Sequence, residues 1–136
     1  MELQPESVPR GNERILLLDD DELGLTSVRN MLERLGYKIT GFTDGEEGLK
    51  VFLEKPYEFD LVITDHLMPN LTGEEIAQKM LRIRSDIPIM LCTGKVDPPW
   101  AKTAMATGVR GVIEKPFTVR ECAQIVRSVL NEDRSK

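Results

Sequence analysis

The stretch Phe59–Gly73, FDLVITDHLMPNLTG, predicts the centre of the fold. Its run Leu61–Thr64 is typical of a strand that is buried on both faces of a parallel sheet, and it stops at the carboxylate of Asp65. A turn follows at 68–70, and then a helix begins. Since ligands bind at the carboxyl ends of the strands in open parallel sheets, Asp65 is a candidate site residue.

Similar apolar runs lie on both sides of this stretch and alternate with helical patterns. We expect further strands at 15–18, 37–42, 87–92 and 112–113. The pairs Thr72 with Glu75 and Thr118 with Glu121 have the spacing of capping boxes, which mark helix starts. Five strands that alternate with five helices predict an α/β fold, with a parallel sheet covered by helices on both faces.

The composition is that of one ordinary globular domain with a core of its own. Of 136 residues, 40% are hydrophobic and 30% charged, and the net charge of −5 argues against direct nucleic-acid binding. No segment resembles a signal peptide or is apolar for long enough to span a membrane, so we expect a cytoplasmic domain without membrane contact. Cys92 and Cys122 lack metal-ligand spacing and are expected to be reduced core thiols.

The two ends of the chain differ in composition from the middle. Residues 1–13 are polar and contain Pro5, Pro9 and Gly11, which predicts a linker or flexible tail. The folded domain is expected over 14–131, and the polar residues 132–136 are expected to fray.

Several polar side chains stand at strand ends, and the carboxyl ends of parallel strands meet at one rim of the sheet. This rim is expected to carry Asp19, Asp20, Asp65, Thr93 and Lys115. Three carboxylates repel each other unless a cation neutralises them, and oxygen ligands in this number suit Mg²⁺. The hydroxyl and the ammonium suit phosphoryl oxygens. We therefore interpret Asp65 as a nucleophile that accepts a phosphoryl group.

Four segments together resemble the receiver domain of two-component response regulators: LLLDDDE (16–22), ITDHLMPNLTG (63–73), IMLCTG (89–94) and VIEKPF (112–117). The resemblance covers about residues 14–131. It implies a flavodoxin-like (βα)5 three-layer sandwich whose parallel five-stranded sheet has the order 2-1-3-4-5. It also implies that Asp65 takes its phosphoryl group from the phosphohistidine of a histidine kinase.

The same resemblance implies a set of metal ligands. Asp20 and Asp65 would bind Mg²⁺ directly, together with the backbone carbonyl of Leu67, and Asp19 would act through water. His66, the neighbour of Asp65, is expected to point to the other side of the strand and to have a packing role.

Further implications concern the phosphoryl group and the partners. Thr93 and Lys115 would bind the phosphoryl group, and the peptide bond between Lys115 and Pro116 would be cis. The partner would be a sensor histidine kinase or its phosphotransfer or dimerisation domain, and a phosphorylation-dependent dimer is compatible with this class. The domain would be no enzyme beyond self-phosphorylation and slow autodephosphorylation.

Two other functions and two origins stay open. A pseudo-receiver would be a binding module without phosphorylation, but such modules usually lose an acid or the lysine. A haloacid-dehalogenase-type phosphatase needs a second Asp two residues after the nucleophile, where this chain has Leu67. The segments 11–20 and 82–94 are similar to receivers at the C-terminal end of hybrid histidine kinases, so we expect an excised kinase domain rather than a stand-alone regulator.

Overall fold

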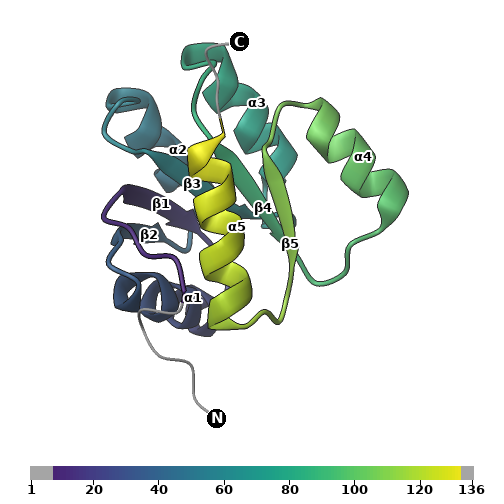
Figure 1. The fold of residues 1–136 in the computed structure, drawn as a ribbon. Coiled ribbons are helices and arrows are strands. Elements are labelled where there is room, and N and C mark those ends of the chain that lie inside the picture. The colour runs from purple at the N-terminus through teal and green to yellow at the C-terminus, as the bar shows by residue number, and fades with distance from the viewer. Residues whose placement is uncertain (1–7, 133–136) are drawn as a thin grey trace.

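The computed structural model describes residues 8–132, which form a parallel sheet between two layers of helices (Figure 1). The strand order is β2-β1-β3-β4-β5, and all four strand pairs are parallel. This confirms the flavodoxin-like (βα)5 sandwich. The elements are β1 Arg14–Leu18, α1 Glu22–Arg34, β2 Lys38–Phe42, α2 Gly45–Glu54, β3 Leu61–Asp65, α3 Gly73–Ile83, β4 Ile89–Thr93, α4 Pro98–Ala106, β5 Gly111–Glu114 and α5 Val119–Asn131.

The strand boundaries differ slightly from those expected. The fourth strand begins at Ile89 rather than at 87, and it extends to Thr93. Pro88 has no N–H to give to a ladder, and its carbonyl alone joins the sheet, by accepting a 3.0 Å hydrogen bond from the Val62 N–H. The third strand extends by one residue to include Asp65.

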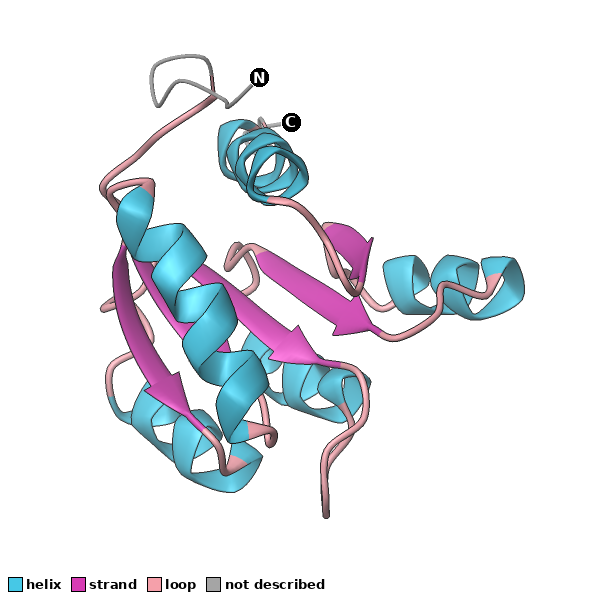
Figure 2. Cartoon of the chain, turned by 90° about the horizontal axis from the view of Figure 1, so that it is seen from below, coloured by secondary structure: helices cyan, strands magenta, loops and turns pink. Residues whose placement is uncertain are grey.

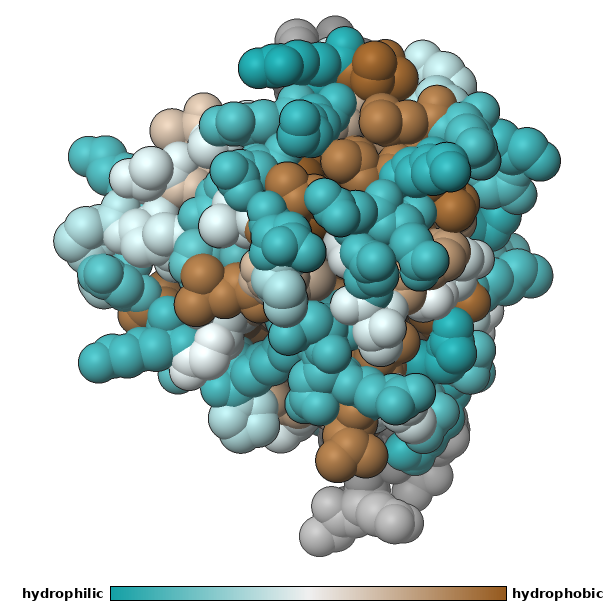
Figure 3. All heavy atoms as spheres, turned by 180° about the vertical axis from the view of Figure 1, so that it is seen from behind, coloured by the Kyte–Doolittle hydropathy of each residue, from teal (hydrophilic) through white to brown (hydrophobic). Residues whose placement is uncertain are grey.

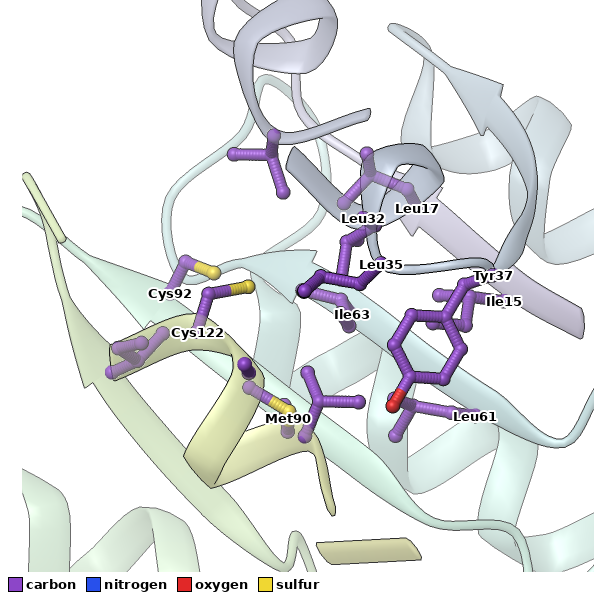
Figure 4. Packing of buried hydrophobic residues seen from close by; sticks show 14 of the residues in the cluster. Ile15, Leu17, Leu32, Leu35, Tyr37, Leu61, Ile63, Met90, Cys92 and Cys122 are labelled. Atoms are coloured by element: carbon purple, nitrogen blue, oxygen red, sulfur yellow. The ribbon is translucent and has the colours of Figure 1, made fainter. Parts of the chain in front are cut away.

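Alternate residues of the strands contribute to two separate hydrophobic cores, one on each face of the sheet. Figure 2 shows helices on both sides of the strands. On one face, Ile15 and Leu17 pack with residues of α1 and α5, including Leu32 and Cys122 (Figure 4). On the other face, Leu16 and Leu18 belong to a cluster with Phe52, Ile76, Met80 and Ala104. Strands buried on both faces explain the continuous apolar runs in the sequence.

Both predicted capping boxes are present. The Thr72 hydroxyl accepts a hydrogen bond from the Glu75 N–H at 3.1 Å, and the Glu75 carboxylate accepts one from the Thr72 N–H at 2.8 Å. Thr118 and Glu121 exchange the same two bonds at the start of α5. Such pairs satisfy N–H groups that the first helical turn leaves without a partner, so they fix where α3 and α5 begin.

The segment that leads into β1 lies against the domain. Val8 is buried, and the Gly11 N–H donates to the Leu35 carbonyl at 3.1 Å. Gly36 has a φ of +104°, and a Cβ there would lie 2.2 Å from the Gly11 carbonyl oxygen, so only glycine fits this crossing. Residues 1–7 of the expected linker and 133–136 of the expected tail lie outside the described residues.

Apolar side chains come to the surface in several patches between hydrophilic ones (Figure 3). Both cysteines are buried free thiols, as expected, and the peptide bond between Lys115 and Pro116 is cis, as expected. Among the described residues, 8–132, no helix has the length and apolar character needed to cross a membrane.

Candidate functional site

The register of the central strands brings the first and third strand ends together. Leu18, the last residue of β1, lies opposite Thr64 of β3. The next residue of each strand is an acid, Asp19 after β1 and Asp65 at the end of β3, so the two acids meet at the rim. Together with Asp20, they offer one carboxylate oxygen each within 4.8 Å of one another. The sheet therefore assembles the three acids that the sequence analysis assigned to one site.

Lys115 supplies the positive charge at this rim. The strand pair β4–β5 places Thr93 opposite Glu114, and the Lys115 N–H then donates to the Thr93 carbonyl at 2.7 Å. From this position the Lys115 ammonium lies 2.7 Å from Asp65 Oδ1 and 2.9 Å from Asp19 Oδ2. One cation thus bridges two carboxylates that come from different strands.

Burial and charge set the protonation of the site. Burial and a hydrogen bond with Asp19 raise the pKa of Asp65 to about 7, although Lys115 acts in the opposite direction. Burial alone would lower the pKa of Lys115, but its bonds to Asp65 and Asp19 outweigh burial and raise it. Lys115 is therefore charged, and Asp65 changes its charge near neutral pH. A second cation at the rim would favour the ionised form of Asp65.

A pocket of about 290 Å³ opens at this rim. The Thr93 side chain reaches it, but its hydroxyl is used within its own turn, where it donates to the Lys95 carbonyl at 3.1 Å. A rotation about χ1 would free this hydroxyl for another acceptor. The pocket is lined by Asp21, Asp65, His66, Leu67, Cys92, Thr93, Gly94 and Lys115.

The turn after Asp65 places Leu67 at the pocket. Asn70 has a φ of +74°, and Leu67 pairs with Thr72 in an isolated bridge, so the turn folds back on itself. A Cβ at Gly73 would lie 2.5 Å from the Asp65 carbonyl oxygen, which explains why glycine begins α3. Leu67 lines the pocket and is itself exposed to solvent.

Beside the pocket lies a contact that the sequence analysis missed. The imidazole of His66 lies with Nδ1 2.8 Å from Glu74 Oε1, and the indole N–H of Trp100 donates to Glu74 Oε2 at 2.5 Å. The two rings also pack together, with centroids 4.3 Å apart. His66 therefore packs, as expected, but it also lines the pocket. No sequence pattern marks the pairing of Trp100 with Glu74.

A second unforeseen contact ties the loop after β4 to β5. Glu114, the residue before Lys115, accepts a 2.9 Å hydrogen bond from the Val96 N–H through its side chain. The loop that begins at Thr93 is thus held at two points, by Glu114 and by the turn of Thr93 itself.

Comparison with known proteins agrees with this fold. The model of the response regulator receiver domain family matches residues 15–127. The probable transcriptional regulator ycf27 of Porphyridium aerugineum is 37% identical over 122 residues, which are 87% of this chain and 48% of that protein. The alkaline phosphatase synthesis transcriptional regulatory protein PhoP of Bacillus subtilis (strain 168) is 33% identical over 120 residues, which are 88% and 49%.

Solved structures give the same result. The crystal structure of a response regulator receiver domain protein from Clostridium thermocellum superposes with a TM-score of 0.82 at 29% identity, over 88% of this chain and 94% of that one. The chain belongs to the receiver domain family of two-component response regulators. It spans about half the length of the curated relatives it matches. The roles of individual site residues, the domain boundaries and the hybrid-kinase origin stay predictions.

Proposed function

We propose that this domain, over residues 14–131, is the phosphoacceptor of a two-component phosphorelay and that Asp65 is the residue phosphorylated. The observation that carries the proposal is the ammonium of Lys115, 2.7 Å from Asp65 and 2.9 Å from Asp19, at a rim with a third acid. Phosphoryl transfer needs positioning and charge neutralisation more than acid–base catalysis, and this rim offers both.

In the proposed reaction, the side chains act from the positions described above. An ionised oxygen of Asp65 attacks the phosphorus of a phosphohistidine on the partner, the P–N bond breaks as the P–O bond forms, and the released imidazole takes up a proton. Lys115 holds one Asp65 oxygen and is placed to bind an oxygen of the incoming group. The Thr93 hydroxyl binds another phosphoryl oxygen after it rotates away from Lys95.

The donor set fits a divalent cation. The oxygens of Asp19, Asp20 and Asp65 converge, and Leu67 lines the pocket that Asp65 also lines. All are oxygen donors, as hard cations prefer, and Mg²⁺ typically takes one or two carboxylates and keeps several waters. As the resemblance to receivers implies, Asp20 and Asp65 would bind Mg²⁺ directly together with the Leu67 carbonyl, and Asp19 would act through water. The ion, when bound, supplies charge neutralisation for the phosphoryl group.

The partner follows from the reaction. A phosphohistidine is the donor, so the domain meets a sensor histidine kinase or its phosphotransfer or dimerisation domain, in the cytoplasm. In this proposal it binds no nucleic acid or membrane itself, it catalyses only its own phosphorylation and slow dephosphorylation, and phosphorylation can favour a dimer.

The test is labelling with a phosphodonor, with and without Mg²⁺. Wild type is expected to form an acyl phosphate that depends on Mg²⁺ and is cleaved by hydroxylamine, whereas Asp65→Asn is expected to keep its fold and remain unlabelled. A wild type that does not label under any of these conditions would support a pseudo-receiver. Multiple turnover of a generic phosphatase substrate would support a phosphatase.

A further inference from the structure

Three side chains next to the phosphorylation pocket join three different elements. His66 follows β3, Glu74 lies in the first turn of α3, and Trp100 lies in the first turn of α4. The Glu74 carboxylate bridges the other two, with one oxygen 2.8 Å from the imidazole Nδ1 and the other 2.5 Å from the indole Nε1. The rings also contact each other, so the three side chains form a closed triangle.

Of the three side chains, His66 lies at the pocket beside Asp65. His66 follows Asp65 directly and lines the same pocket. Its backbone is fixed on both sides, because its N–H donates to the Cys92 carbonyl and its carbonyl accepts from Gly73, both at 2.8 Å. Any group that binds at residues 65–67 therefore acts on the segment that carries the imidazole.

Trp100, at another corner of the triangle, attaches α4, a helix that has few attachments of its own. Ala104 is the one fully buried residue of α4, and Figure 1 shows this helix at the edge of the molecule. Asp97, at the N-cap, makes no side-chain cap bond. Trp100 is half-buried, and it packs on the core below α4 in addition to its bond with Glu74. The indole is thus a principal anchor for the first turn of α4.

We propose that the triangle of His66, Glu74 and Trp100 is the link through which phosphorylation releases α4, an inference that rests on the proposed function. A phosphoryl group adds negative charge to the pocket that His66 lines, and the imidazole of His66 contacts the Glu74 carboxylate. Like charges repel, and the imidazole N–H is drawn toward the new anion. Both effects weaken the contacts of Glu74, and the bond from Trp100 is lost with them.

Two measurements report on the triangle without any added label. Trp100 is its single tryptophan, so indole emission reports the triangle directly. Amide hydrogen exchange over residues 100–106 reports the attachment of α4. A hydrogen bond to a charged group changes a local opening equilibrium by about tenfold when it is lost.

The experiment compares wild type with Glu74→Ala and Trp100→Phe, each with and without beryllofluoride and Mg²⁺ as a mimic of the phosphoryl group. Trp100→Phe keeps a ring but removes the indole N–H. Gln78→Ala, at an exposed position of the same helix α3, is the matched control. Circular dichroism and Mg²⁺-dependent labelling of each variant show that the fold and the site are intact.

In wild type and Gln78→Ala, the mimic is expected to raise exchange over 100–106 by about tenfold and to change the indole emission. In Glu74→Ala and Trp100→Phe, exchange is expected to be raised already without the mimic and to change little when it is added. If the mimic raises exchange over 100–106 in both variants as much as in wild type, the triangle is not the link to α4, and the proposed function still stands. A wild type that neither labels nor responds overturns the proposed function, and the link with it.

Discussion

The raised pKa of Asp65 predicts how the stability of the metal-free domain changes with pH. The pKa of this carboxyl rises from 3.8 to about 7 in the folded state. A group whose pKa is higher in the folded state contributes stability that is fully present below its unfolded pKa and is lost as the pH rises through the folded value. The metal-free domain is therefore expected to lose stability from this group between about pH 4 and pH 8.

The magnitude follows from the size of the change. An interval of about three pH units corresponds to at most about 4 kcal/mol, at about 1.4 kcal/mol for each unit. Because Asp65 faces a pocket open to water, solvent screening reduces this contribution, and we expect about 1–2 kcal/mol. Mg²⁺ selects the ionised carboxylate and binds only the folded state, so it should restore the loss at high pH.

Urea denaturation at pH 5.0 and pH 8.5, in the presence of a chelator, measures this contribution. Other groups titrate as well, so the quantity compared is the pH-dependent loss in wild type minus that in Asp65→Asn, which lacks the titrating carboxyl. Glu58→Gln, an exposed change in the loop that enters the opposite end of β3, serves as the control and should behave as wild type. An equal loss of stability in wild type and Asp65→Asn would refute the reasoning.

Three further outcomes follow from the same contacts. In wild type, Mg²⁺ at 100 times its Kd should raise the unfolding free energy by about 2.7 kcal/mol, and Asp20→Ala should lose this response in urea titrations; an unchanged response would place the ion elsewhere. Lys115→Ala leaves Asp19 and Asp65 without their shared cation, so it should lower the free energy of unfolding by about 2–4 kcal/mol at pH 8.5 and by less at pH 5.0, where Asp65 is protonated. An equal loss at both pH values would contradict this. Gly73→Ala forces a Cβ against the Asp65 carbonyl, so it should lower the free energy of unfolding by about 1–3 kcal/mol and slow the labelling of Asp65. Unchanged stability and labelling would mean that the turn relaxes around the added methyl group.

Local patterns predicted the parts of the fold that local interactions determine. The two capping boxes need only residues three apart, and the runs in β1, β3 and β4 are apolar because both faces of these strands are covered. The order of the strands came from the resemblance to receivers, since alternating strands and helices alone fit more than one order. Once the order is known, the meeting of Asp19 with Asp65 follows from the register.

Contacts between distant segments were not predictable in the same way. Glu74 and Trp100 are 26 residues apart, and an acid in a first helical turn or a tryptophan in another has ordinary explanations of its own. Glu114 similarly reaches back 18 residues to the Val96 N–H. Val8 stands in a polar stretch with prolines nearby, yet it is buried, because the chain before β1 crosses close to Gly36. These contacts depend on tertiary geometry that no spacing in the sequence records.

The central claim is that Asp65 is the residue that receives the phosphoryl group. The most direct measurement is to label the protein with a phosphodonor and Mg²⁺, reduce the acyl phosphate with borohydride, and locate the modified residue by peptide mass spectrometry. The modification is expected at Asp65 alone, and it should be absent in Asp65→Asn. Modification of Asp19, Asp20 or another acid at comparable yield in wild type, or undiminished labelling of Asp65→Asn, would contradict the claim.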